Sequence, residues 1–319
     1  MTPLPRFLVS RFVHAVPLLL LVSVLVFLLI HAAPGGPLAI YLANPNVRPA
    51  DIERLRRALG LDRPLWQQYW TWLWAFVQGD WGYSFSDGRP VAARIVERMP
   101  ATFELVAVSL AGALVLTMPA GVGAAVARGR WIDRVVTTAS MIGVAIPAFW
   151  FGLLLQMIFA VSLGWLPSSG RATPGGADAI DHLQHLVLPA AVLAIVLASG
   201  WSRFLRGSMI QTLAHPFIVA TRARGLAPPR VVLRHALRNA LGPLIALVTV
   251  DAALLVSGAV VTESVFAWPG LGSLFTEALA RRDYTVLMAL LMLSAAAVVV
   301  FNFLGDLAHA VIDPRVPAA

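Results

Sequence analysis

Long apolar segments that contain few or no charged residues recur along this chain of 319 residues, and they constrain its fold more than any other feature. A helix of about 20 such residues crosses the hydrocarbon core of a membrane. Hydrophobic residues make up 59% of the chain, more than the interior of a soluble domain of this length can bury. We therefore predict an all-α polytopic membrane protein. The six transmembrane helices are expected at residues 12–32, 101–127, 135–163, 186–204, 240–261 and 286–311.

Prolines and glycines inside these segments indicate how the helices pack. Pro147 and Pro189 interrupt the third and fourth spans, where neighbouring helices or waters can satisfy the freed carbonyl groups. Small residues let helix backbones approach closely in a membrane. We expect this role for Gly112, Gly121, Gly123, Gly143, Gly152 and Gly258.

The first apolar segment resembles a signal peptide because Arg6 and Arg11 precede it. A cleaved signal has a shorter apolar core, of about 7–15 residues. We therefore interpret residues 1–33 as a retained first transmembrane helix.

Arginine fixes the predicted orientation, because short basic segments stay in the cytoplasm. The intervening segments 34–100, 164–185 and 262–285 mix acidic residues with arginine. Six alternating spans place all the basic segments on one side, so both termini are predicted to be cytoplasmic. The basic segments contain Arg6 and Arg11; Arg128, Arg130 and Arg134; the arginines between Arg203 and Arg238; and Arg315.

Residues 34–100 are predicted to form an external helical segment, followed by a five-helix transmembrane core with a cytoplasmic loop in residues 101–319. Pro64 can open a helix at its first position. Aromatic residues at this density favour the headgroup zone of a membrane. We interpret this helix as interfacial or packed rather than as a site that stacks on a sugar or other ligand. Its aromatic residues include Trp66, Tyr69, Trp70, Trp72 and Trp74.

The stretch ATRARGLAPPRVVLRHALRNALGPLI, residues 220–245, concentrates arginine around a glycine and two prolines. Residues 216–224 can form a short helix, and Gly225 suits the left-handed residue that ends one. Pro228 and Pro229 suit the first turn of a second helix. Arg230, Arg234 and Arg238 recur every fourth residue, so they form one stripe. The pattern predicts two short helices joined by a tight elbow, a shape suited to docking in a groove of another protein. The alternative is a plain basic loop that only sets topology.

This stretch resembles the cytoplasmic coupling loop of permease subunits of ATP-binding cassette (ABC) importers, and it is most similar to the dipeptide/oligopeptide/nickel branch. Further similar stretches follow in the order expected for that family: LGLDRPLWQQYWTWL at 59–73, GDWGYSF at 79–85, TESVFAWPGLG at 262–272 and DPR at 313–315. The chain departs from the family pattern at residues 216–219, which read PFIV where polar or acidic residues are frequent, and at Thr221, where alanine is common.

The resemblance implies a non-catalytic subunit of six spans in the inner membrane of a bacterial or archaeal cell. It also implies that this subunit works with a homologous second permease, two cytoplasmic cassette ATPases and an extracytoplasmic solute-binding protein. It implies that the coupling loop, residues 205–239, moves as a lever when the ATPases bind and hydrolyse ATP. Peptides fit the branch best, while nickel chelates, glutathione and oligosaccharides stay open as substrates. The coupling residues it implies are Ala220, Arg222, Ala223, Arg224, Gly225, Leu226, Arg234, His235, Arg238 and Asn239.

Two polar residues within predicted spans are candidates for the translocation path. Asp251 lies midway along the fifth span, where a charge must face protein or water. A role in the path or between subunits is as well supported as a structural pairing. Asn302 fits a hydrogen bond between helices better than a substrate contact.

The sequence argues against other chemistries. His182 and His185 share a helix face, but no second cluster supplies further metal ligands, so we predict no metal or other cofactor. No serine lies in a Gly-x-Ser-x-Gly elbow, and no Gly-Lys-Ser/Thr phosphate loop is present. The formal net charge of +8 does not indicate nucleic acid, because the basic residues alternate with apolar spans.

The competing function is a stand-alone secondary transporter. That class usually has more spans, inverted repeats and several buried ionisable residues. Here Asp251 is nearly alone.

Overall fold

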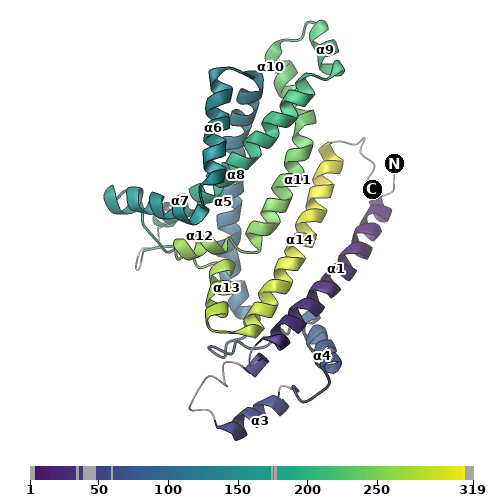
Figure 1. The fold of residues 1–319 in the computed structure, drawn as a ribbon, viewed down its shortest axis with the longest axis vertical. Helices are drawn as coiled ribbons and strands as arrows, with labels where there is room; N and C mark the ends of the chain where they lie inside the picture. The colour runs from purple at the N-terminus through teal and green to yellow at the C-terminus, as the bar shows by residue number, and fades with distance from the viewer. Residues whose placement is uncertain are drawn as a thin grey trace.

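The computed structural model describes residues 4–33, 36–38, 48–58, 60–173, 175 and 178–312, and every regular element within these ranges is helical. Five continuous helices are long and apolar enough to cross a membrane. Figure 1 shows them running along the long axis of the molecule, with α9 and α10 at one end and α3 at the other. The first span is Val13–Ala32 within α1 (Leu4–Ala32), and the others are α5 (Val91–Val126), α8 (Ala179–Leu213), residues Pro228–Val256 and α14 (Tyr284–Ile312).

A bent pair of helices replaces the single interrupted span predicted at residues 135–163, and it makes a sixth span if both halves are counted as one. α6 (Trp131–Ala145) and the helix that follows Pro147 meet at 101°. Ile146 is extended because the proline ring crowds the residue before it. The second half, α7 (Ala148–Leu155), continues through the wider turns of residues Gln156–Ser162. Figure 1 shows α7 projecting sideways from the bundle.

The boundaries of the fourth and fifth spans also differ from the prediction. α8 begins before residue 186 and ends after residue 204, and Pro189 lies buried inside it. The fifth span ends at Val256 rather than at residue 261. Gly258 stops it with a φ of +120°, and a Cβ there would lie 2.8 Å from the Cα of Gly272. The chain then forms α12 (Val260–Val265) and α13 (Leu271–Ala280) before it enters α14.

Glycines set the close contacts of the bundle, as predicted, with one exception. A Cβ at Gly121 of α5 would lie 2.9 Å from the Cβ of Leu205 in α8, and one at Gly112 would lie 3.2 Å from the Cβ of Ala194. Gly143, Gly152 and Gly258 also face close neighbours. Gly123 does not, since a Cβ there would meet nothing within 4 Å, so its predicted packing role is wrong.

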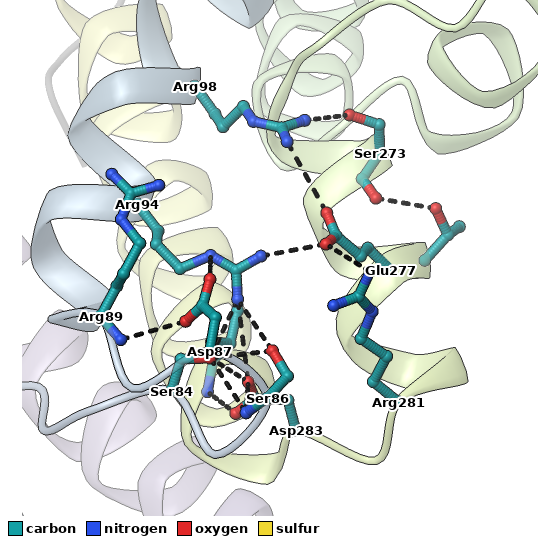
Figure 2. A network of polar contacts seen from close by, with 12 residues as sticks. Ser84, Ser86, Asp87, Arg89, Arg94, Arg98, Ser273, Glu277, Arg281 and Asp283 are labelled. Atoms are coloured by element: carbon teal, nitrogen blue, oxygen red, sulfur yellow. Dashed lines mark hydrogen bonds and ion pairs between the residues drawn. The ribbon is translucent and has the colours of Figure 1, made fainter.

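A polar network fastens the segment before α5 to the helices that follow α12 (Figure 2). The guanidinium of Arg94 donates to Ser84 Oγ at 3.0 Å and to Glu277 Oε1 at 3.2 Å. The buried carboxylate of Asp283 accepts hydrogen bonds from the Ser84 hydroxyl and from two backbone amides. Partial burial alone would raise the pKa of Asp87, but an amide N–H, the Ser84 hydroxyl and Arg94 hold that pKa below its ordinary value. Asp87 therefore stays charged at neutral pH.

Candidate functional site: the elbow between α8 and α11

The elbow predicted around Gly225 is present. α9 (Pro216–Ala223) follows α8 and ends where Gly225 adopts a φ of +76°. The amide of Gly225 donates to the carbonyl of Arg222 at 2.9 Å, which closes the turn. α10 (Pro228–Arg230) then begins with proline at its first position. Figure 1 shows the two helices forming one tip of the molecule.

The second helix of the elbow is not short, which corrects the predicted pair of short helices. Nothing between Arg230 and Leu237 breaks the helix, because no proline or glycine lies there. Residues Val231–Ala236 form wider π-type turns and lead directly into α11 (Leu237–Val256). The second helix of the elbow and the fifth span are therefore one continuous helical element, residues Pro228–Val256.

The outer surface of the elbow is basic. The side chains of Arg222 and Arg224 at the end of α9 are exposed, as are the three arginines of the predicted stripe, Arg230, Arg234 and Arg238. Ala220, Ala223, Gly225 and Asn239 are exposed too, while Leu226 and His235 are partly buried. Of these, Asn239 donates to the carbonyl of His235 at 2.7 Å. The elbow thus presents small residues and arginine together, a surface that a carboxylate-bearing groove would complement.

The inner surface of the elbow is apolar and holds it to the bundle. Ile218 of α9 and Val231 are buried in one cluster with Leu205 and Met209 of α8 and Ala236. Leu226 packs against the same cluster. Replacing a buried isoleucine by alanine typically costs about 2–5 kcal/mol. The elbow is therefore a fixed part of the bundle rather than a loose loop.

Two hydrogen bonds tie α8 to α11 beneath the elbow. Ser208 Oγ donates to the carbonyl of Ala240 at 2.9 Å. Deeper in the bundle, the indole N–H of Trp201 donates to Asp251 Oδ2 at 2.6 Å. Asp251 thus has a partner within the chain, which is the structural pairing that the sequence left open. Its role in a translocation path stays a prediction.

An ion pair with a buried carboxylate joins α6 to α8. Arg206 contacts the carboxylate of Asp133 through both Nε and Nη2, with 2.8 Å between Nη2 and Oδ2. The amide of Gly129 donates to the same carboxylate at 2.9 Å. The side chain of Asp133 is 6% exposed and that of Arg206 is 29% exposed. Ser140 and Ser202 add a second link between these helices at 2.8 Å.

The stretch TESVFAWPGLG is organised around the buried carboxylate of Glu263. Thr102 Oγ1 of α5 donates to Glu263 Oε1 at 2.8 Å, and the amide of Ser273, in the first turn of α13, donates to Oε2 at 2.9 Å. Trp268, also buried, donates from its indole N–H to the carbonyl of Ala101 at 2.8 Å. A single acidic side chain therefore caps α13 and joins it to α5 and α12.

The remaining candidate residues lie apart from the elbow. The side chain of Asn302 in α14 is exposed, and its predicted role between helices stays a prediction. His182 bonds to Glu104 and to the carbonyl of Arg171, while His185 bonds to the carbonyl of Asp181 at 2.8 Å. In the described part of the chain, no group of three or more His, Asp or Glu residues could hold a metal ion.

Sequence reasoning missed Asp133, Arg206 and the role of Glu263. Asp133 lies among Arg128, Arg130 and Arg134, and Arg206 lies close to Arg203, so in the sequence both belong to basic segments that set orientation. Charges in spans that face protein are expected to pair. That rule applies to Asp251, but Arg206 lies beyond the predicted fourth span, 186–204, and only the longer α8 of the structure brings it into the helix.

Comparison with known proteins identifies families and relatives that match this chain. Residues 117–317 match the family described as "Binding-protein-dependent transport system inner membrane component", and residues 4–106 match the family of its N-terminal part. The chain is 40% identical to the oligopeptide transport system permease protein AppB of Bacillus subtilis strain 168 over 312 residues, covering 97% of this chain and 98% of that protein. It is 38% identical to the glutathione transport system permease protein GsiC of Escherichia coli K12, covering 98% of each.

The fold is also similar to a solved structure. A chain of the inward-facing MetNI methionine ABC transporter aligns with a TM-score of 0.57 at 22% identity, covering 70% of this chain and 98% of that one. This likeness concerns the fold alone. The sequence matches span nearly the whole chain, and they favour an importer permease over a stand-alone secondary transporter. The chain therefore belongs to the family of inner-membrane components of binding-protein-dependent transport systems, the non-catalytic permease subunits of ABC importers.

Proposed function

We propose that this permease carries peptides or small peptide-like solutes, and that the elbow of residues 216–239 is the surface that its ATPase partners grip. The single observation that carries the proposal is the two-sided elbow. Its arginines are exposed, whereas Ile218 and Val231 fix its inner side to the bundle. Partner ATPases can therefore push on this exposed surface while its buried side chains keep the elbow packed against α8.

The proposed mechanism follows from how the elbow is connected. α9 is joined to α8, and α10 runs without a break into α11. The bonds from Ser208 to Ala240 and from Trp201 to Asp251 hold these helices together, and the Asp133–Arg206 pair adds α6. A displacement of the elbow by a closing pair of ATPases would therefore move α6, α8 and α11 as one body. Such a movement can switch access between the two sides of the membrane.

The proposed assembly contains a homologous second permease, two cytoplasmic cassette ATPases and an external solute-binding protein. The relatives named for oligopeptides and for glutathione support a peptide-like substrate. We propose that both termini lie in the cytoplasm, on the same side as the elbow. Binding measurements on the cognate solute-binding protein would identify the substrate directly.

Replacing Gly225 by valine is expected to weaken coupling without unfolding the bundle. The φ of +76° disfavours a β-branched residue by about 1–2 kcal/mol, while a Cβ would meet nothing within 4 Å. The turn between α9 and α10 would change its conformation, while the packing of the transmembrane helices would be retained. We expect normal membrane insertion but reduced substrate-stimulated ATP hydrolysis and transport in the assembled complex.

The control for Gly225 is Gly123→Ala in α5, a helical glycine that also has open space around it but whose φ is not positive. It should leave both activities unchanged. Full coupling in Gly225→Val would count against the elbow as a lever.

Reversing charge at the end of α9 is expected to release the ATPases. In the variant Arg222→Glu/Arg224→Glu, two exposed guanidiniums become carboxylates, which would repel an acidic groove. We expect a large loss of ATPase co-purification, strongest at low salt, where the charge repulsion is least screened. The matched control is Arg54→Glu in α3 (Pro49–Ala58), an exposed arginine at the opposite end of the molecule (Figure 1). Equal retention of ATPase in both variants would contradict the proposed docking surface.

A further inference from the structure

α4 (Leu65–Val77) has two different faces. Tyr69 and Trp72 pack with Phe27 of α1, and Phe76 stacks on Trp81. Another face carries three largely exposed indoles at helical spacing, of which Trp70 meets the neighbouring Tyr69 ring edge-on at 5.2 Å. Trp66, Trp70 and Trp74 are 63%, 58% and 68% exposed, although tryptophan is the most costly side chain to leave in water.

The position of α4 along α1 sets its depth in the membrane. Gln68 Oε1 lies 3.1 Å from His31 Nε2 near the end of the first span. Tyr69 Oη lies 2.8 Å from Ser23 Oγ. Ser23 lies about 12 Å along α1 from His31, at 1.5 Å per residue, and well inside the apolar span Val13–Ala32. Figure 1 likewise shows α4 alongside the lower end of α1. The helix therefore lies beside the outer half of a transmembrane helix, not beyond it.

The composition of α4 agrees with that depth. The sequence LWQQYWTWLWAFV contains no charged residue, so a bilayer can solvate its outer face without burying an ion. The same half of α1 also exposes Leu25, Leu28 and Leu29, which suit acyl chains in a span. Side chains of α4 at the same level meet the same surroundings. Indoles are favoured there because the ring is apolar and its N–H reaches the headgroup zone.

We propose that α4 is embedded in the outer leaflet and that its face of Trp66, Trp70 and Trp74 binds phospholipid. The segment between the first two spans is then only partly aqueous. α3, with exposed Arg54 and Asp51, stays in water, while α4 is a membrane helix that fastens α1 to the bundle. This sharpens the interfacial interpretation of the aromatic helix into a defined lipid-binding face at a defined depth.

The test uses the absence of cysteine from the chain. Single cysteines introduced by Trp66→Cys, Trp70→Cys and Trp74→Cys would each carry a nitroxide spin label. The complete importer would be reconstituted in vesicles of phosphatidylethanolamine and phosphatidylglycerol. Collisions with apolar oxygen and with a water-soluble nickel chelate would then be compared. We expect oxygen to dominate at all three positions and the nickel chelate to dominate at the control position, Arg54→Cys.

Two outcomes would overturn the proposal. Dominant nickel collisions at the tryptophan positions would place α4 in water. Low collision rates with both reagents would mean that another protein chain covers this face. Val77→Cys, exposed at the end of α4, keeps all three indoles and reports the same depth if a tryptophan variant fails to assemble. The measurement locates α4 without depending on how the elbow acts.

Discussion

Gly272→Ala is expected to destabilise this permease severely. A Cβ at Gly272 would lie 2.7 Å from the Cα of Val260 and 2.8 Å from its backbone nitrogen, so α12 and α13 could not keep their present contact. Separating them would also withdraw the Ser273 amide from the buried carboxylate of Glu263. We expect a loss of about 3 kcal/mol, seen as a lower unfolding temperature of the purified complex and as loss of transport.

Gly123→Ala is the matched control for this experiment, because it adds the same methyl group to a helical glycine with open space around it. Its unfolding temperature should stay near that of the unaltered protein. A Gly272→Ala protein as stable as this control would mean that α12 and α13 do not meet as closely as described. The contacts of Glu263 with α5 and α13 would then contribute little to the stability of the protein.

The contrast between Pro147 and Pro189 shows that the effect of a proline on a transmembrane helix could not be predicted from this sequence alone. Both prolines lie in apolar segments and were interpreted as tolerated interruptions. Pro189 is buried within α8, where neighbouring helices keep the helix continuous. Ile146, ahead of Pro147, is extended, and the chain turns by 101°. A single sequence does not show which neighbours a proline will meet, so the bend at α7 could not be foreseen.

The elbow was predictable because its signals are local. Gly225 ends one helix and Pro228 begins the next through the conformation of their own backbone. The arginines around them indicate the cytoplasmic side of the membrane. The roles of Glu263 and Asp133 were not predictable in this way. Glu263 meets Thr102 and Asp133 meets Arg206, and each pair joins helices that are distant in the chain. Such pairs depend on helix register, which hydropathy and charge counts do not specify.

Asp133→Ala is expected to have the second large effect. The substitution leaves Arg206 without its carboxylate in a site that water reaches poorly, and breaking a buried pair costs more than the pair contributes. Because the Arg206 side chain is 29% exposed, we expect the lower part of the usual range, about 3 kcal/mol. The unfolding temperature of the complex should fall. Substrate-stimulated ATP hydrolysis should also weaken, since α6 would be joined to α8 less firmly.

Two further variants separate the buried charge from the general loss of an ion pair. Glu97→Ala removes a carboxylate whose oxygen also lies 2.8 Å from an arginine nitrogen, but Arg89 and Glu97 are 53% and 59% exposed, so little change is expected. The double variant Asp133→Ala/Arg206→Met removes both charges and should recover much of the lost stability. If it recovers stability but not coupling, the pair transmits movement from α8 to α6. If Asp133→Ala proves as mild as Glu97→Ala, the ion pair does not hold α6 to α8, and the proposal that it makes α6 part of one rigid body with α8 and α11 would fail.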